Sequence, residues 1–366
     1  MNRQYAAVDL HLARSLIVRE DQAGTELAVE RIDNSPMNLA AALADAGPNP
    51  EVAIEATYGW YWAVDVLQEL GATVHLVNPS GLGQSWEGRR VKNDYKDCRE
   101  LIDRMRLHKL PEAWIAPPEL RELRELVRYR AKLVNIRTGL KAQVKAVLAK
   151  HCLRPPVKDL WVGHRGASFL DELALPDAYI TRIESLRDLV GVVNREVAML
   201  ERTIHGRLRD DRGYRAIQHL EGVGPVLAAV FCAEIGDAGR FAGPQTLCSW
   251  SGLTPKHRES DGKAHRGRTT KQGSRLVRWA AIEAISKMRG GPKLKIDYQP
   301  HRGAPRHQRG PRRGGPQASH PRLLRPARRR DPLPRPGRGG VRPDRHSQGA
   351  SSSSGMTSPL GAWSSK

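Results

Sequence analysis

The stretch KNDYKDCRELIDRMR, residues 92–106, joins two carboxylates to the start of an amphipathic pattern. Asp94 is suited to cap a helix, and Asp97 then lies on the first turn and on the same face. Two carboxylates at this spacing can share a divalent metal if other acids reach them. A capped, charged first turn would need the same residues, so the positions of the other acids decide. The helix is predicted from apolar residues at helical spacing, Cys98, Leu101, Ile102 and Met105.

The segment before this helix predicts a mixed sheet with crossover helices. Period-two and short apolar runs predict three strands, then a helix, a strand, a helix, a strand and a glycine-containing loop. An antiparallel meander that leads into parallel crossovers is the ribonuclease-H-like (RuvC-like) arrangement. The predicted elements are strands 5–10, 15–19 and 27–32, a helix from Ser35-Pro36 to Ala46, strand 52–55, helix 60–70 and strand 72–77.

Two further acids end apolar strands of this predicted sheet. Asp9 ends the run VDL on the first strand, and Glu55 ends the fourth. An acid in such a place is costly to bury unless it is paired or bound to a metal. Solvated acids at strand ends are the simpler alternative. Because three converging elements carry Asp9, Glu55, Asp94 and Asp97, we expect these four residues to form a metal site.

The motifs around these acids resemble the N-terminal DEDD domain of the insertion-sequence 110 family of transposases, which includes the Piv-type DNA invertases. The matching segments are VDLH at Asp9, EATYGWYW at Glu55 and KNDYKD at Asp94 and Asp97. The resemblance implies that the four acids bind Mg²⁺ in a domain similar to the RuvC resolvase. In the family a lysine often follows the first acid, whereas here the next residues are Leu10-His11-Leu12, a departure that we expect not to matter.

Residues 119–204 contain two apolar seams at coiled-coil spacing. Two long helices with such seams can pair with each other as an antiparallel hairpin or pair between chains. The family resemblance favours an oligomerisation role for this insert. The first seam consists of Leu126, Tyr129, Leu133, Ile136, Leu140 and Val147, and the second of Leu186, Val190, Val193, Val197, Leu200 and Ile204.

The stretch HLEGVGPVLAAVF, residues 219–231, has the pattern of a helix-hairpin-helix motif. Gly222 and Gly224 would let the backbone approach a phosphate, and Pro225 at the first helical position leaves free amides beside it. Such a turn binds a nucleic-acid backbone without reading its sequence. The same glycine turn can also be a plain connection between helices.

Residues 247–285 resemble the C-terminal transposase domain of the same family, in GLTP, the S-x-G-K segment and GRTTKQGSRLVRWA. In the family a serine after GLTP attacks a DNA phosphate and holds it as a phosphoserine, and the matching position is Ser260. Where the family often has a serine pair, Glu259 and Asp261 flank this serine. A polar loop residue in a basic hairpin is the alternative. The surrounding basic residues predict phosphate contacts: Lys256, Arg258, Lys263, Arg266, Arg268 and Lys271.

The composition indicates a polyanionic partner. The net charge is +21, and residues 290–366 supply +14 of it with 17 Lys/Arg and 3 Asp/Glu. The Pro/Gly/Arg-rich character of that segment predicts a disordered basic tail. Either a shifted reading frame or a basic arm that holds nucleic acid would account for it. Four scattered cysteines without a C-x-x-C pair, no apolar run of membrane-spanning length and no expected signal peptide suggest a cytoplasmic protein.

We therefore expect an α/β domain followed by all-α domains in a DNA transposase or recombinase with an acidic Mg²⁺ site and a serine nucleophile. The resemblance also implies a structured guide RNA encoded by the element and a homo-oligomer, a dimer or tetramer. The alternatives are a RuvC-like metal-dependent junction nuclease and a non-catalytic DNA-binding protein. The expected domains are 1–112 (RNase-H-like), 113–212 (coiled coil or helical hairpin), 213–289 (serine-bearing, with the helix-hairpin-helix) and 290–366 (tail).

Overall fold

A computed structural model of the chain describes residues 3–83, 93–260 and 263–288. At residues 257, 258, 260 and 263–266 it describes the backbone alone. The described residues belong to one compact unit, 1–299. The predicted basic tail, 290–366, lies outside the described residues.

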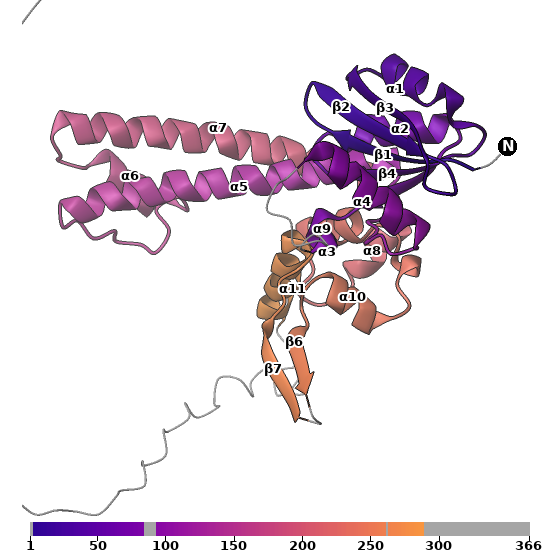
Figure 1. Ribbon diagram of the computed structural model, residues 1–366. Coiled ribbons are helices and arrows are strands. Elements are labelled where there is room, and N and C mark those ends of the chain that lie inside the picture. The colour runs from indigo at the N-terminus through magenta and orange to yellow at the C-terminus, as the bar shows by residue number, and fades with distance from the viewer. Residues whose placement is uncertain (1–2, 84–92, 261–262, 289–366) are drawn as a thin grey trace, which may run out of the picture. The chain divides into compact units, whose positions relative to one another are not determined.

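The N-terminal part is a five-stranded mixed sheet with helices on both faces (Figure 1). The strand order is β3-β2-β1-β4-β5, with β1, β2 and β3 antiparallel and with β4 and β5 parallel to β1. This order is consistent with a ribonuclease-H-like fold. The elements are β1 (Tyr5–Leu10), β2 (Arg14–Glu20), β3 (Glu26–Asp33), α1 (Pro36–Ala42), the 3₁₀ helix η1 (Ala44–Ala46), β4 (Glu51–Glu55), α2 (Trp60–Glu69), β5 (Thr73–Val77), α3 (Pro79–Leu82) and α4 (Asp94–Arg106).

The central strand β1 is apolar from Ala6 to Val8 because both of its faces are covered there. Its even-numbered residues Ala6, Val8 and Leu10 pack in a cluster with residues of α1 and α2. Ala7 packs on the opposite face with the buried side of α4. Successive strand residues point to opposite faces, so Asp9 shares the α4 face with Ala7.

The middle of the chain is a helical hairpin of α5 (Pro118–Lys150) and α7 (Asp177–Leu208), with α6 (His164–Asp171) between them. The two long helices lie side by side and antiparallel (Figure 1), since Leu133 near the middle of α5 packs with Val197 and the end of α5 packs with the start of α7. The seams therefore pair within the chain. Tyr129 and Ile136, predicted in the α5 seam, are instead 51% and 45% exposed.

The C-terminal part is helical except for one two-stranded hairpin. Its core includes residues of α9 and α11 and also Leu123 and Val127 of α5 and Ile204 of α7, so the open end of the helical hairpin belongs to this core. The elements are α8 (Arg212–Ile217), α9 (Pro225–Ile235), η2 (Ala238–Arg240), α10 (Pro244–Trp250), β6 (Pro255–Ser260), β7 (Lys263–Thr269) and α11 (Arg275–Lys287). In the part of the chain described here, none of the helices is both long and apolar enough to cross a bilayer.

Candidate metal centre and serine-bearing hairpin

Two of the four predicted acids meet where β1 ends and α4 begins. Asp9 is the fifth residue of β1, opposite Leu16 in the β1–β2 ladder, and Asp94 is the first residue of α4. The predicted helix start is one residue off. The capping residue is Asn93, whose side chain accepts a hydrogen bond of 3.0 Å from the Tyr95 amide, and Asp94 is already helical.

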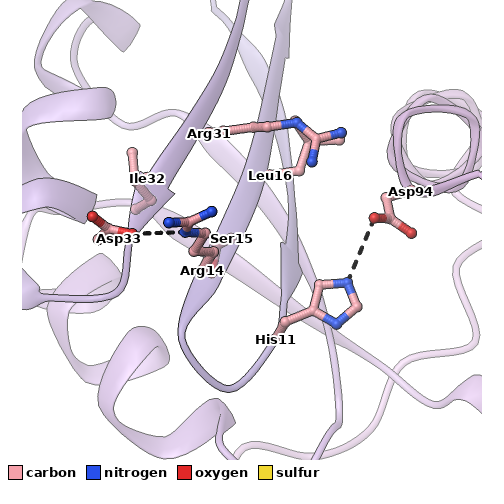
Figure 2. A pocket seen from close by; sticks show the side chains of 8 residues that line it. All are labelled: His11, Arg14, Ser15, Leu16, Arg31, Ile32, Asp33 and Asp94. Carbon is pink, nitrogen blue, oxygen red and sulfur yellow. Dashed lines mark hydrogen bonds and ion pairs between the residues drawn. The ribbon is translucent and has the colours of Figure 1, made fainter. Parts of the chain in front are cut away.

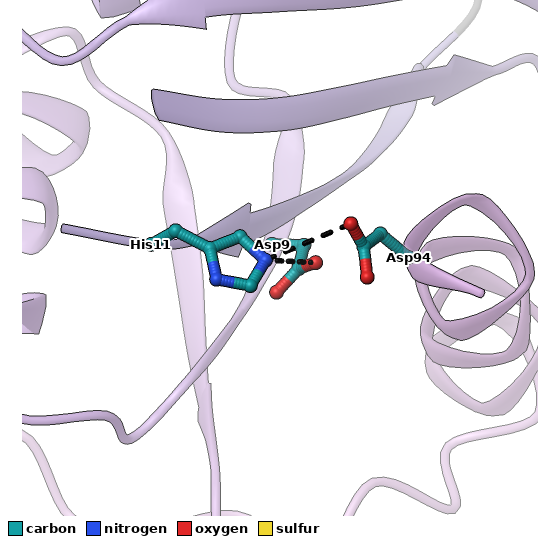
Figure 3. A group of neighbouring side chains, drawn as sticks. All are labelled: Asp9, His11 and Asp94. Atoms are coloured by element: carbon teal, nitrogen blue, oxygen red, sulfur yellow. Dashed lines mark hydrogen bonds and ion pairs between the residues drawn. The ribbon is translucent and has the colours of Figure 1, made fainter. Parts of the chain in front are cut away.

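A histidine that the sequence prediction set aside, His11, reaches both acids with one ring nitrogen (Figure 3). Nε2 of His11 is 3.1 Å from Oδ2 of Asp9 and 3.7 Å from Oδ2 of Asp94. One ligand atom from each of the three residues lies within 4.8 Å of the other two. The Asp9 side chain is 20% exposed and that of Asp94 38% exposed, so the group is open to a ligand from solvent. Carboxylate oxygens and imidazole nitrogen suit divalent cations such as Mn²⁺, and the carboxylates alone suit Mg²⁺.

The other two acids approach the same place from neighbouring positions. Glu55 lies one step beyond the last paired residues of β1 and β4, Val8 and Ile54, which puts it beside Asp9 in the next strand. It is paired with Val77, a member of the cluster under α4, so it shares the α4 face with Asp9. Glu55 is not a member of the three-residue group described above.

Asp97 lies one turn after Asp94 on α4 and also remains outside the three-residue group. Its charge is nonetheless felt at the same place. Burial first, and then the charges of Asp9, Asp97 and Asp94, raise the pKa of the Cys98 thiol to about 12. Asp97 directly precedes Cys98, so its charge adds to those of Asp9 and Asp94 at this buried thiol.

A cavity of about 310 Å³ opens beside the acidic group (Figure 2). Arg31 on β3 faces it from the position opposite Leu16. No carboxylate among the described residues forms an ion pair with Arg31, whereas Arg14 is 2.9 Å from Asp33. The wall therefore offers cationic side chains next to the acids, as a polyanionic substrate would require. The lining residues are His11, Arg14, Ser15, Leu16, Arg31, Ile32, Asp33 and Asp94.

Ser260 is the last residue of β6, at the tip of the β6–β7 hairpin, and not in an irregular loop. Its backbone pairs with Lys263, and Arg258 pairs with His265 one step further back. By this register Arg258 and Lys263 are on the same face of the ladder as Ser260. Arg266 pairs with His257 and by register is on the opposite face. Of the other predicted phosphate contacts, Lys256 and Arg268 are exposed on the two strands, and Lys271 is exposed just after β7.

A buried carboxylate holds the start of α11, the helix that follows this hairpin. Glu234 of α9 is 4% exposed and accepts hydrogen bonds from Arg128 Nε at 2.8 Å and from Ser274 Oγ at 2.9 Å. Ser274 in turn caps α11 by accepting from the Val277 amide at 3.3 Å. One side chain thus links α5, α9 and the first turn of the helix that follows the hairpin.

The predicted helix-hairpin-helix turn lies between α8 and α9. Gly222 has a φ of +84°, and an added Cβ would be 2.2 Å from the Ala284 carbonyl oxygen of α11. Packing against α11 therefore explains this glycine without a ligand. An added Cβ at Gly224 would meet nothing within 4 Å, and Gly224 precedes Pro225 at the start of α9. Phosphate binding at this turn stays a prediction.

Known proteins match both halves of the chain. Residues 7–153, which hold the four acids, match the DEDD transposase family of IS110, and residues 214–299, which hold Ser260, match the family described as "Transposase IS116/IS110/IS902 family". The chain belongs to the IS110 family of transposases. The family predicted from the motifs around Asp9, Glu55 and Asp94 is thereby confirmed.

Three relatives show how far the likeness extends. A "Probable family 20 transposase" of Pseudomonas aeruginosa is 27% identical over 63% of this chain and 69% of its own length. "Putative transposase y4qE" of Sinorhizobium fredii is 30% identical over 65% of this chain and 57% of its own. "Insertion element IS116 uncharacterized 44.8 kDa protein" of Streptomyces clavuligerus is 23% identical over 80% and 86%. The aligned segment thus falls short of each relative's full length.

Proposed function

We propose that this transposase cuts and rejoins DNA strands with two groups of residues, an acidic centre that holds Mg²⁺ and the nucleophile Ser260. The convergence of Asp9, His11 and Asp94 within 4.8 Å carries the proposal for the centre. Glu55, in register beside Asp9, and Asp97, one turn after Asp94, would complete it. This is the centre of a ribonuclease-H-like domain of the DEDD type.

The acids would act by fixing the phosphate that is to be cut. A bound divalent cation neutralises the phosphate oxygens and the charge that develops on the leaving oxygen. Asp9 and Asp94 belong to a sheet and a helix that pack on each other through buried side chains, so their separation is set by the core and not by a loop. Arg31 would contact a neighbouring phosphate of the same strand from the cavity wall.

Ser260 would attack the phosphorus with its hydroxyl oxygen. A bond from Oγ to phosphorus forms, the bond from phosphorus to the sugar oxygen of the departing strand breaks, and the serine proton is passed on so that this oxygen leaves as a hydroxyl. Attack by the hydroxyl of another strand reverses these steps and restores the serine. The energy of the phosphodiester is kept in the phosphoserine, so joining needs no other energy source.

The proposed partners are DNA, a structured RNA encoded by the element, and further copies of the chain. Arg258 and Lys263, in register with Ser260, would neutralise the attacked phosphate. Self-association is supported by large apolar side chains that the helical hairpin leaves about half exposed. They are Tyr129, Ile136, Leu189, Val192 and Met199.

A suicide-substrate experiment tests both halves of the proposal. The full chain is incubated with labelled element-end DNA, element RNA and Mg²⁺, and the products are separated on a denaturing gel. We expect a labelled protein–DNA adduct that Ser260→Ala and Asp94→Asn abolish. Matched controls are Ser286→Ala on the exposed side of α11 and Asp103→Asn, whose side chain is 66% exposed on the same helix as Asp94.

Each of the other outcomes would indicate a different function for this chain. Cleaved DNA without an adduct would indicate a metal-dependent junction nuclease, in which water attacks the phosphate. Binding that weakens steeply with salt, without any cleavage in Mg²⁺, would indicate a non-catalytic DNA-binding protein. An adduct that persists in Ser260→Ala would assign the nucleophile to another residue.

A further inference from the structure

We propose that His11 is itself a ligand of the metal centre, through Nε2, and that this centre therefore prefers a divalent transition-metal ion such as Mn²⁺ over Mg²⁺. The inference rests on the proposed acidic centre and adds to it one residue and a metal preference. The preference follows from the donor atoms, because Mg²⁺ takes oxygen ligands almost exclusively, whereas a transition-metal ion also accepts an imidazole nitrogen.

The distances fit a shared ion. Neighbouring ligands of a six-coordinate ion with bonds of about 2.1 Å lie about 3 Å apart. Nε2 of His11 is 3.1 Å from Asp9 Oδ2 and 3.7 Å from Asp94 Oδ2. In Figure 3 one nitrogen of the imidazole is directed at both carboxylates. One ligand atom of each residue already lies within 4.8 Å of the other two, which is close to the span of a single ion's ligands.

The backbone holds His11 in this place through Asn34, which follows β3. The Asn34 side-chain amide donates to the His11 carbonyl oxygen at 2.7 Å, and its backbone amide donates to Ala13 O at 2.8 Å. Ser15 Oγ donates to Asn34 Oδ1 at 2.6 Å, which fixes the orientation of that amide. The His11 amide closes the turn by donating to Arg14 O at 3.2 Å. A turn tied at this many points presents the imidazole to the acids with little conformational freedom left to lose.

The orientation of the ring also suits coordination. Nε2 faces the carboxylates and would donate its proton to Asp9 there; a metal ion would take the place of that proton, and Nδ1 would then carry the remaining one. The His11 side chain is 55% exposed, which lets Nδ1–H donate to solvent, as the second nitrogen of a metal-bound histidine usually donates to a partner. The simpler reading is that His11 only forms an ion pair with Asp9, and the experiment separates the two.

The test compares metal binding by the full chain and by His11→Gln, which keeps a hydrogen-bond donor toward Asp9 but removes the imidazole nitrogen. Mn²⁺ and Mg²⁺ affinities are measured by calorimetry, without DNA. We expect Mn²⁺ affinity to fall about tenfold or more and Mg²⁺ affinity to change much less. The control is His219→Gln at an exposed position in the turn after α8, which should leave both affinities unchanged.

A spectroscopic measurement on the unaltered chain does not depend on the variant folding. Protein labelled with ¹⁵N-histidine is loaded with Mn²⁺, and pulsed electron paramagnetic resonance records coupling to a directly bound nitrogen. Coupling that is present in the unaltered chain and absent in His11→Gln supports the inference. Bound Mn²⁺ without histidine coupling, or an unchanged Mn²⁺/Mg²⁺ ratio in His11→Gln, overturns it.

Asp94→Asn separates this inference from the proposed centre. If the centre exists, Asp94→Asn weakens both metals whatever His11 does. If Asp94→Asn leaves both affinities unchanged, or the unaltered chain binds neither metal, the centre fails and the role of His11 fails with it. Loss of both metals in Asp94→Asn together with an unchanged ratio in His11→Gln refutes only the nitrogen ligand.

Discussion

Replacing Glu234 by Gln tests whether one buried carboxylate holds the start of α11, the helix that follows the serine-bearing hairpin. The side chain is 5% exposed and takes both Arg128 nitrogens, Nε at 2.8 Å and Nη2 at 3.2 Å, as well as the Ser274 hydroxyl. Gln keeps the shape but loses the charge. In the variant, the amide nitrogen of Gln replaces one carboxylate oxygen, so a donor of Arg128 or Ser274 faces another donor instead of an acceptor.

The structure sets the expected magnitude. Removing one partner of a fully buried ion pair costs about 3–5 kcal/mol. The Arg128 side chain is 47% exposed, so water can recover part of its hydration, and the loss approaches that of a charge-assisted hydrogen bond, about 1.5–3 kcal/mol. We therefore expect Glu234→Gln to lower the free energy of unfolding by about 2 kcal/mol. Ser274→Ala, which removes the cap of α11, should cost about 1 kcal/mol.

The assay is urea unfolding combined with native-state hydrogen exchange of the Val277 amide, which Ser274 caps. The double variant should cost less than the sum of the single variants, because Glu234 and Ser274 share one contact. Glu201→Gln is the matched control. It removes a comparable pair with Arg130, but the Glu201 side chain is 40% exposed, so the loss should stay below about 1 kcal/mol. A Glu234→Gln loss no larger than that of the control, with unchanged exchange at Val277, would refute the reasoning.

Three other perturbations have defined outcomes. Leu148→Ala, at a side chain 1% exposed between α5 and α7, should lower the free energy of unfolding by about 2–5 kcal/mol in urea; a loss below 1 kcal/mol would contradict the packing. Gly222→Ala should lower the melting temperature, because φ is positive at Gly222 and the added Cβ would meet a backbone carbonyl. Gly139→Ala, where the added Cβ meets nothing on α5, should raise the free energy of unfolding by about 0.5–1 kcal/mol. Thermal unfolding of the two variants shows whether the two effects have opposite signs. Burial and the charge of Asp9 raise the pKa of Cys98 to about 12, so little of this thiol is ionised at pH 8. Iodoacetamide at pH 8 should therefore modify the exposed Cys152 and leave Cys98 unmodified. Equal labelling of the two cysteines by mass spectrometry would contradict the burial of Cys98.

The sheet and its helices were predictable because their signals are local. Alternating and continuous apolar runs located every strand of the sheet, and the alternation of strands with helices predicted the parallel crossovers. The start of α4 was off by one residue because Asn93 and Asp94 are equally good caps and adjacent. Only the backbone conformation, extended at Asn93 and helical at Asp94, distinguishes them.

The seam of α5 was predicted less well because a straight helix does not follow a heptad repeat. A helix with 3.6 residues per turn drifts by about 20° per heptad, so over the 33 residues of α5 the buried stripe moves around the helix. Tyr129 and Ile136 fit the heptad and are exposed, whereas Val127 and Val144 lie off the predicted seam and are buried. Which residues of α5 are buried therefore depends on their contacts with α7 and not on the heptad repeat.

In the candidate site, too, the residues with a local sequence signal were predicted and those placed by distant contacts were missed. Asp9 and Asp94 were predicted because acids that end apolar runs stand out in the sequence. His11 was set aside, and its place depends on Asn34, 23 residues away in the chain. The one signal that pointed to it was its position two residues after Asp9, beyond the end of the strand. Glu234 gave no signal, because an acid inside a helix is ordinary until its burial is known.

Helix α5 explains how two separately matched segments act as one molecule. Arginines at successive turns of its first half contact helices from distant parts of the chain. Arg121 is 3% exposed, pairs with Asp65 of α2 and donates to Tyr61 O. Arg124 donates to the Ala233 carbonyl oxygen of α9 at 2.8 Å, and Arg128 binds Glu234. Because α2 packs on the sheet that carries Asp9 and α9 anchors the helix after the Ser260 hairpin, strain applied to the helical hairpin by a second copy of the chain would reach both groups of residues through the same helix.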